Sequence, residues 1–319
     1  MAPTKHPAQG AGRFVARVNN PLKEKTMRSN KLMAVAVITT LVLAACGSDD
    51  ASTSDATADT EPPTTEAAAG DACSNTIEDG VLTIATGNPA FFPWVIDDAP
   101  ESGQGFEAAV ALAVGEQMGY SGDSVTWVRT DFDAAIQPGA KDFDFNLQQF
   151  SITDERKETV DFSAPYYTAN QAIVALNGSS AEGAASIADL KDVKFGAQAG
   201  TTSFAFITDV IQPTQDVFAY DDNVGAKAAL EANQIDAAVF DLPTALYVSG
   251  VEIDGSSVVG QFPAAAGGTT DEFGLLLEKD SPLTPCVNAA LQALSESGEL
   301  AAITNEWLSE FTGAPVISE

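Results

Sequence analysis

Along most of the chain, segments with the apolar pattern of a strand alternate with segments with the apolar pattern of a helix. Residues 81–86 and 125–129 are rich in β-branched and apolar residues and are bounded by turn residues, which predicts two strands. Residues 105–118 place apolar side chains three or four positions apart, which predicts a helix. A short helix is expected after Asp131, and a third strand is expected at 143–148. Strands and helices therefore take turns in the first half of the chain.

The same alternation returns in the second half. Further strands are expected at 172–176, 194–197, 217–220, 235–240 and 273–277. Further helices or helical turns are expected at 186–190, 201–211, 223–232, 242–248, 281–297 and 299–311. Because 319 residues are enough for two domains, this order predicts two wound α/β units.

The third strand leads into a corner with the features of a ligand contact. Ser151 and Thr153 suit a helix N-cap, and Arg156 follows in the first helical turn. Open α/β sheets bind ligands at such corners, and a guanidinium matches a carboxylate with two parallel hydrogen bonds. The alternative is that Arg156 pairs with Glu158 or Asp161 on a solvated helix.

The first part of the chain is not typical of a folded domain. Arg28 and Lys31 precede an apolar run at 32–43, which is too short to span a bilayer and has the length of a signal-peptide core. The small residues before Cys46 resemble a bacterial lipobox, in which that cysteine becomes the lipidated N-terminus. Residues 1–45 are therefore expected to be upstream residues and a lipoprotein signal peptide, with translation beginning at Met27.

Residues 46–72 are predicted to form a disordered acidic linker rich in Ser, Thr and Pro, because they contain almost nothing apolar to bury. The whole chain has 15 Lys and Arg against 45 Asp and Glu, and residues 1–45 hold seven of the basic residues and one acid. Such an acidic remainder excludes nucleic-acid binding by a basic face and attachment to anionic lipid by charge. Membrane attachment would then depend on the lipid at Cys46.

The histidine and cysteine content limits the catalytic groups, metal sites and disulfides that the mature chain can form. The single histidine, His6, lies within residues 1–45, so the mature chain has no imidazole for a Ser-His-Asp or Cys-His nucleophile or for a metal. No catalytic residue, metal or cofactor is expected. With Cys46 lipidated, Cys73 and Cys286 remain as a pair in an oxidising setting, which favours a disulfide. The alternative is two separate buried thiols.

Several motifs in order resemble the family 3 solute-binding proteins, the amino-acid receptors of ABC importers. The resemblance covers residues 76–312. It rests on the segments SITDER (151–156), DFSAPYY (161–167), GAQAGTT (196–202), IDAAVFD (235–241) and NEW (305–307). It implies a two-lobe periplasmic-binding-protein-like α/β fold of type II, in which each lobe is a wound sheet and two hinge crossings join the lobes.

The resemblance also implies where the lobes divide. The first lobe would comprise residues 73–169 together with 268–319, and the second lobe residues 170–267. The crossings would fall near 168–171 and 263–270.

In such a receptor, Arg156 would bind the carboxylate of an amino acid and Asp241 would accept hydrogen bonds from its ammonium group. Ser151, Thr201 and Thr202 would supply further hydrogen bonds, with the Thr pair at a helix N-terminus. The alternatives are that the Gly-Thr-Thr segment is an ordinary N-cap and that Asp241 only caps the helix at 242.

Aromatic and amide residues complete the implied site. Phe91 and Phe132 would sandwich the ligand side chain with Trp94 close by, although burial in the core is the alternative for all three. Gln149, and Gln148 before it, stand where the family usually has small residues, so they would narrow the pocket or donate to the ligand. Asn88 stands where relatives that bind basic amino acids often carry an acid. An uncharged polar amino acid is therefore expected.

The resulting prediction is a monomeric extracytoplasmic lipoprotein that is not an enzyme. It would capture an amino acid between two lobes and deliver it to an ABC transporter permease, with no nucleic acid as a partner. Two alternatives stay open at this point. One is a dehydratase-like enzyme that uses carboxylates on the same fold, and the other is an amino-acid-sensing module for a membrane partner.

Overall fold

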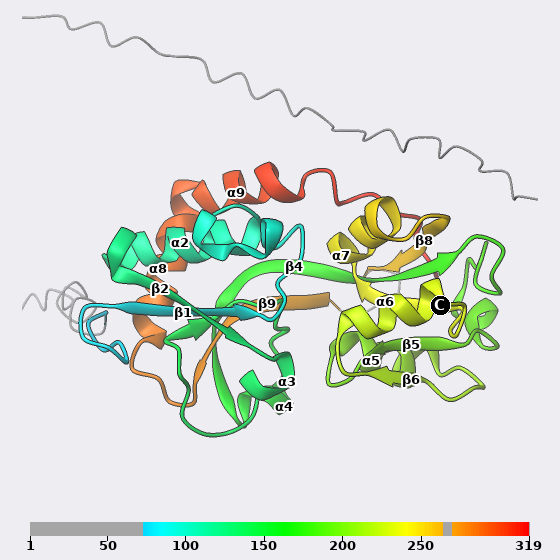
Figure 1. Ribbon diagram of the computed structural model, residues 1–319, viewed down its shortest axis with the longest axis horizontal. Coiled ribbons are helices and arrows are strands. Elements are labelled where there is room, and N and C mark those ends of the chain that lie inside the picture. Colours follow the sequence, from blue (N-terminus) through cyan, green and yellow to red (C-terminus); the bar gives the residue numbers. More distant parts are fainter. Residues whose placement is uncertain (1–72, 264–269, 319) are drawn as a thin grey trace, which may run out of the picture. The chain divides into compact units, whose positions relative to one another are not determined.

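The structure is a computed structural model that describes residues 73–263 and 270–318 (Figure 1). Cys46, the expected signal peptide and the expected linker lie outside these residues. The described strands form one nine-stranded sheet in the order β2-β1-β3-β9-β4-β7-β5-β6, with β8 paired to β4. Within the described residues, no helix combines the length and the apolar character needed to cross a membrane.

One half of the sheet belongs to the first lobe. Its strands are β1 (Leu82–Gly87), β2 (Val125–Thr130), β3 (Phe145–Asn146), β9 (Thr270–Glu278) and the first part of β4 (Val160–Leu176). β1 pairs in parallel with β2 and β3, whereas β9 is antiparallel to β3 and β4. The helices of this lobe are α2 (Phe106–Met118), α3 (Phe132–Ala135), α4 (Asp154–Lys157), α8 (Thr284–Ser297) and α9 (Glu299–Leu308).

Helices α2, α8 and α9 pack together on one side of this half-sheet (Figure 1). α2 is apolar on nearly all sides because the sheet and two helices cover it, and its residues Phe106 and Val110 are fully buried in the core of the lobe. The helix begins after Gly105, which has φ 104° and lies so close to the backbone of Trp94 that a Cβ would clash at 2.5 Å. Sequence and packing therefore agree on both the helix and its start.

The other half of the sheet belongs to the second lobe. Its strands are β5 (Phe195–Gln198), β6 (Phe218–Tyr220), β7 (Ala237–Asp241) and β8 (Ser256–Phe262), together with the end of β4. Its helices are α5 (Thr202–Phe206), α6 (Asn223–Glu231) and α7 (Leu242–Tyr247). The shorter 3-10 and π turns are η1 (Ile96–Asp98), η2 (Pro100–Ser102), η3 (Gly122–Ser124), η4 (Ile187–Leu190), η5 (Ile207–Ile211) and η6 (Val248–Glu252). Two apolar clusters fill this lobe, one on each side of β4 and β7.

The first crossing between the lobes is a continuous strand. β4 pairs with β9 up to Asn170 and with β7 and β8 from Gln171 onward. The expected crossing at 168–171 therefore coincides with a change of partner inside one strand and not with a break in it. The expected second crossing at 263–270 falls largely outside the described residues.

The C-terminal segment corrects one expected boundary, because residues 314–318 pack on the second lobe and not on the first. The amide of Gln261 donates to the carbonyl of Pro315 at 2.7 Å, and the amide of Ile317 donates to the carbonyl of Gln261 at 3.0 Å. Ile317 is 1% exposed within the core of the second lobe, where Gly260 leaves room for it. An apolar side chain at the end of the chain thus finds its burial site beside the edge strand β8.

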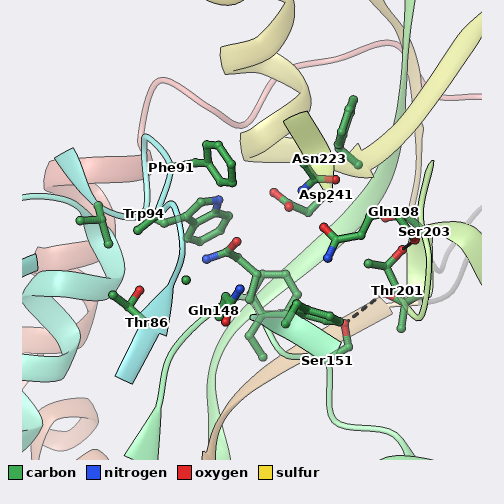
Figure 2. Close-up of a pocket in the computed structure, with 18 of the residues that line it drawn as sticks. Thr86, Phe91, Trp94, Gln148, Ser151, Gln198, Thr201, Ser203, Asn223 and Asp241 are labelled. Carbon is green, nitrogen blue, oxygen red and sulfur yellow. Dashed lines mark hydrogen bonds between the residues drawn. The ribbon is translucent and has the colours of Figure 1, made fainter. Parts of the chain in front are cut away.

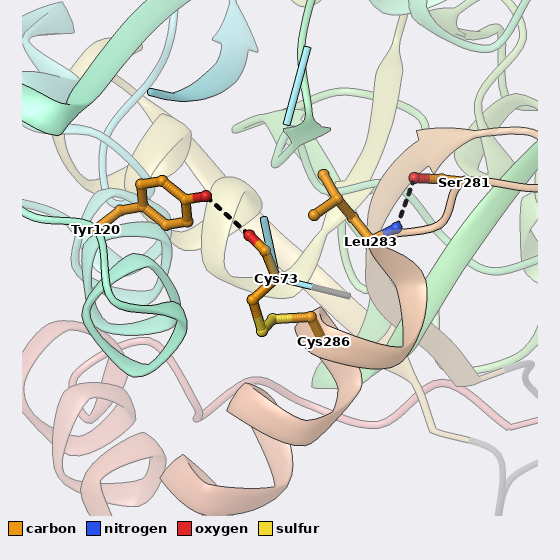
Figure 3. The surroundings of a disulfide bond; sticks show 5 residues. All are labelled: Cys73, Tyr120, Ser281, Leu283 and Cys286. Atoms are coloured by element: carbon orange, nitrogen blue, oxygen red, sulfur yellow. Dashed lines mark hydrogen bonds between the residues drawn. A yellow bond between two sulfur atoms is a disulfide. The ribbon is translucent and has the colours of Figure 1, made fainter. Parts of the chain in front are cut away.

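A disulfide joins Cys73 to Cys286, with their Cα atoms 5.2 Å apart (Figure 3). Cys286 lies in α8 and is 1% exposed within the core of the first lobe. The hydroxyl of Tyr120 donates to the carbonyl of Cys73 at 2.8 Å and holds the same segment. The chain just before β1 is therefore tied to a late helix of the same lobe.

Candidate functional site

A cavity lies between the two lobes and is lined by residues of both (Figure 2). Arg156 and Asp241 are the charged side chains of its lining within the described part of the chain. The neutral polar side chains of the lining are Thr86, Gln148, Gln149, Ser151, Gln171, Gln198, Thr201, Thr202, Ser203 and Asn223. Its aromatic side chains are Phe91, Trp94, Phe132, Phe240 and Phe273.

Arg156 lies in α4, and its position is fixed by hydrogen bonds to both lobes. Thr153 caps the helix by accepting from the Arg156 amide at 3.2 Å. The guanidinium donates through Nη1 to the carbonyl of Ser151 at 2.8 Å and through Nη2 to the carbonyl of Gly200, in the second lobe, at 2.9 Å. These bonds use two of its N–H donors, so others are available to a ligand in the cavity.

The alternative of a solvated ion pair does not describe Arg156. Its side chain is buried, and Asp161 pairs with Lys279 at 2.9 Å instead. Burial lowers the pKa of Arg156, while the carboxylates of Asp271, Glu155 and Asp133 raise it. A guanidinium stays charged despite such shifts, so the cavity contains a fixed cation.

Thr201 and Thr202 lie at the start of α5 and have different roles. The hydroxyl of Thr201 accepts from the amide of Phe204 at 3.1 Å and donates to the carbonyl of Gln198 at 2.7 Å, so it caps the helix. The hydroxyl of Thr202 lies 3.1 Å from the hydroxyl of Ser151 in the other lobe. The N-cap alternative thus applies to Thr201, and both residues also line the cavity.

Asp241 lies at the end of β7 and caps α7 as well as lining the cavity. Its Oδ1 accepts from the amide of Thr244 at 2.9 Å, and its Oδ2 accepts from the hydroxyl of Thr244 at 2.8 Å. Burial raises the pKa of Asp241 to about 6, against the lowering effect of the two bonds from Thr244. The indole of Trp94 donates to the same Thr244 hydroxyl at 2.9 Å, which links the first lobe to this carboxyl group.

The three expected aromatic residues all line the cavity. Phe132 stacks on Phe150 with 4.7 Å between ring centroids, and Cζ of Arg156 lies 5.3 Å from the centroid of the Phe132 ring. Trp94 is 1% exposed and belongs to the core of the first lobe, so it is both a buried core residue and part of the cavity lining. That Phe91 and Phe132 sandwich a ligand side chain stays a prediction.

Phe91 is also held from the second lobe. The Nζ atom of Lys227 lies 4.6 Å from the centroid of the Phe91 ring, and Lys227 pairs with Glu252 at 2.8 Å. Together with the bonds from Arg156 to Gly200 and from Trp94 to Thr244, this contact shows that the two walls touch around the cavity. The structure therefore represents the lobes closed on each other.

Asn88 does not take the expected place. Its side chain is exposed, and the lining contains its neighbours Gly87, Pro89 and Ala90 instead. Asn88 is therefore outside the lining of this cavity, and a contact between Asn88 and the ligand stays a prediction. The chain turns where β1 ends, so this stretch faces the cavity with small or ring-closed residues and directs the amide to solvent.

Gln149 lines the cavity as expected, but the residue that holds it was missed. Gln149 has φ 51° and donates its amide to Oε1 of Glu107 at 2.7 Å and its side-chain Nε2 to Oε2 of the same carboxyl group. The hydroxyl of Tyr166 donates to Oε1 as well. Glu107 is 1% exposed, and burial raises its pKa to about 7.

The sequence did contain a signal for Glu107. It shares one helical face with Val110 and Val114, three and seven positions later, and that face is buried. An acid at such a position needs partners, because burial without hydrogen bonds is costly. Gln171, Gln198, Ser203 and Asn223 line the cavity as well and were missed. Gln198 ends β5, Ser203 and Asn223 lie at the starts of α5 and α6, and Gln171 lies inside β4 where that strand changes partner.

Comparison with known proteins agrees with this geometry. Residues 82–310 match the bacterial extracellular solute-binding proteins, family 3. The L-arginine-binding protein of Pseudomonas aeruginosa is 31% identical over 212 residues, which cover 64% of this chain and 79% of that protein.

Solved structures of similar proteins support the fold. An ancestral arginine-binding protein bound to glutamine is 31% identical, with a TM-score of 0.61 over 72% of this chain and 98% of its own. An ancestral amino-acid-binding protein, a precursor of cyclohexadienyl dehydratase, is 29% identical, with a TM-score of 0.58 over 73% and 96%. The predicted two-lobe α/β fold of type II is thereby confirmed.

Proposed function

Because the chain belongs to the bacterial extracellular solute-binding proteins of family 3, we propose that its cavity binds one free amino acid for delivery to the permease of an ABC importer. One observation carries the proposal. A guanidinium from the first lobe and a carboxyl group from the second lobe line the same cavity. An amino acid carries a carboxylate and an ammonium group on one carbon, so it can bind both lobes at once.

In this arrangement the α-carboxylate of the ligand lies against Arg156, and the hydroxyls of Ser151 and Thr202, which are bonded to each other across the lobes, leave one O–H donor for it. The ammonium group lies against Asp241, whose oxygens are already oriented by Thr244. Both charges of the ligand are then paired in a site from which closure expels water, which strengthens each interaction. Ligand binding and lobe closure thus stabilise each other.

The same proposal includes the attachment of the protein. Lipidation of Cys46 would hold it at the outer face of the cell membrane, and residues 46–72 would let a monomeric domain reach its permease. Removal of the lipidated residue by Cys46→Ser should release the protein into the soluble fraction. Continued membrane association of that variant would contradict the anchor without affecting the proposed ligand.

A thermal-shift screen of the protein against the twenty amino acids tests the proposed function. A ligand that binds only the folded state raises the free energy of unfolding, by about 2.7 kcal/mol at a hundred times its Kd. At least one amino acid should therefore raise the Tm. Ammonium acetate at the same concentration is the control, because it supplies both charges on separate molecules. If no amino acid shifts the Tm, the proposal is wrong.

A second candidate is a dehydratase that acts on a carboxylated ring. It is favoured by one observation, namely that a carboxyl group with a raised pKa, Asp241, lines a cavity together with Phe91 and Trp94. Glu107 has a raised pKa as well, but Gln149 and Tyr166 cover it. Proton NMR of a hydroxylated cyclohexadienyl carboxylate with the protein would show whether an aromatic product forms. Amino-acid binding without such turnover is the expected result.

A further inference from the structure

The charges that line the cavity fit a ligand with no charge on its side chain. Arg156 and Asp241 are the charged lining residues among those the structure describes, and residues 264–269 contain no ionisable side chain. The α-carboxylate and the α-ammonium group use both. A lysine, arginine or glutamate side chain would then bring a third charge into a closed site with no partner left, which is strongly unfavourable.

Three acids close to the lining already have partners, and two more, Asp133 and Glu155, lie near the guanidinium of Arg156 and are exposed to solvent. Oδ1 of Asp98 pairs with Nη1 of Arg129 at 2.6 Å and accepts from the amide of Ala90 at 2.9 Å. The carboxyl group of Glu107 binds Gln149 and Tyr166, and Oδ2 of Asp271 accepts from Nε2 of Gln171. A cationic ligand would have to compete with these protein groups for an acid.

The side-chain amide of Gln148 has a defined orientation in the cavity lining. Nδ2 of the fully buried Asn146 donates to Oγ1 of Thr130 at 2.8 Å, and Thr130 Oγ1 donates onward to Oε1 of Gln148 at 3.4 Å. The oxygen of the Gln148 amide is therefore directed toward Thr130. Its Nε2 is directed along the wall at Gly87, where it lies 3.0 Å from the position a Cβ would take.

The amide of Gln148 lies on the side of Thr86 and Trp94, across the cavity from Gln198 and Asn223 (Figure 2). Its N–H groups can donate to an oxygen of the ligand. Ammonium and guanidinium groups carry donors only, so they would meet a donor at this position. Amide and hydroxyl side chains can accept from Gln148, and the amides of Gln198 and Asn223 can serve either as donors or as acceptors.

Since the site is proposed to bind an amino acid, we infer that it selects an uncharged side chain ending in a hydrogen-bond acceptor, with Gln148 as the selecting residue. Relatives that match this chain include proteins named for arginine binding, so the inference separates this chain from them. It rests on the proposed function, because it assigns the α-carboxylate and the α-ammonium group to Arg156 and Asp241.

Isothermal titration of the whole domain with glutamine, asparagine, serine, arginine, lysine and glutamate at neutral pH tests the inference. At least one of the three uncharged amino acids should bind about tenfold more tightly than any charged one, because one unpaired buried group commonly costs that much. Gln148→Glu should reverse the preference, since it adds the missing acid while keeping the length of the side chain. We expect arginine or lysine affinity to rise about tenfold and the affinity for the uncharged ligand to fall.

The matched control is Gln117→Glu, which adds the same charge at an exposed position of α2 away from the cavity. It should leave every affinity as in the wild type. Tighter binding of arginine, lysine or glutamate than of the uncharged amino acids by the wild type would overturn the inference and leave the proposed function intact. An unchanged preference in Gln148→Glu would overturn the role of Gln148. A lack of binding to any amino acid would instead overturn the proposed function, and the inference with it.

Discussion

The two lobes place opposite charges at similar corners, but they hold these charges differently. Each charged residue lies where a strand or loop passes into a short helix, Arg156 in α4 and Asp241 at the N-cap of α7. Asp241 is held by Thr244 of its own lobe. Arg156 is held in part by Gly200 of the opposite lobe. The carboxyl group is therefore oriented within one lobe, whereas the full set of bonds to the guanidinium depends on closure.

The lobes also differ in how they fix the ends of the chain. The first lobe ties its first residues to α8 with the disulfide between Cys73 and Cys286. The second lobe contains no cysteine and instead receives residues 314–318 beside β8, with Ile317 in its core. One lobe thus uses a covalent bond where the other uses backbone hydrogen bonds and one buried apolar side chain.

Of the changes that test this difference between the lobes, removal of the Arg156 guanidinium should have the largest effect on ligand affinity. Arg156→Ala is expected to weaken binding of the amino acid identified in the screen by about 3–5 kcal/mol, as when one partner of a buried charge pair is removed. Isothermal titration measures the loss. Arg156→Lys should also bind poorly, because an ammonium group cannot form two parallel bonds to a carboxylate.

The matched control for this prediction is Lys157→Ala, which removes a cation from the same helix at an exposed position paired with Asp154. Its affinity should equal that of the wild type. Circular dichroism should show that Arg156→Ala still folds, since the helix cap at Thr153 uses the backbone amide and not the side chain. An unchanged affinity of Arg156→Ala would refute the assignment of the carboxylate partner.

Removing the covalent tie tests the second difference between the lobes. Replacing both Cys73 and Cys286 by Ser should lower the free energy of unfolding by about 2–4 kcal/mol, because the unfolded chain regains the freedom of a long loop. Ligand affinity should stay the same, since neither residue lines the cavity. Denaturant titration measures the stability. Mass spectrometry of the exported, unreduced wild type should show the bridge, and two free thiols there would contradict it.

Much of the fold could be predicted because its signals are local. The strand β1, the helix α2 and the corners before Arg156 and Asp241 follow from side-chain period and cap residues within a few positions. The cavity residues at these corners were found for the same reason. A strand end followed by a helix start is visible in the sequence, and the topology brings such ends together.

The features that were missed depend on contacts between distant segments. β4 continues through its change of partner at Asn170 because β9 pairs with one part and β7 and β8 with the other. β8 begins with Ser256 and contains Gly260, so its sequence alternates only weakly between apolar and polar residues. The strand forms because it pairs with β4. The place of Ile317 and the partners of Glu107 likewise arise only in the folded chain. The exposure of Asn88 could not be predicted either, because a turn after a strand leaves the direction of a side chain open.

The smallest expected effect concerns Asp241, and pH separates its charge from its capping role. The pKa of Asp241 is raised to about 6, so the free protein is mostly protonated at this group below that pH, and binding an ammonium group there must release the proton. Wild-type affinity should therefore fall by up to about tenfold for each pH unit below 6. The same raised pKa means that the contribution of Asp241 to folding stability is largest at low pH and is lost as the pH rises through about 6.

Asp241→Asn keeps an oxygen that can accept from the Thr244 amide, and Asn caps helices as well as Asp does, but its amide nitrogen replaces the oxygen that accepts from the Thr244 hydroxyl. Stability should therefore fall by about 1 kcal/mol, the contribution of one hydrogen bond. The substitution removes the charge, so ligand affinity at neutral pH should fall by about 1.5–3 kcal/mol, the contribution of a hydrogen bond to a charged group.

Titrations between pH 5 and pH 7.5 should then show that affinity depends steeply on pH in the wild type and only weakly in the variant. If the steep dependence persists in Asp241→Asn, the titrating group is Glu107, whose pKa is raised to about 7 beneath Gln149. If the variant also binds with unchanged affinity, Asp241 serves only as the cap of α7, and the ammonium group of the ligand must be bound elsewhere, with Gln149 the first residue to replace.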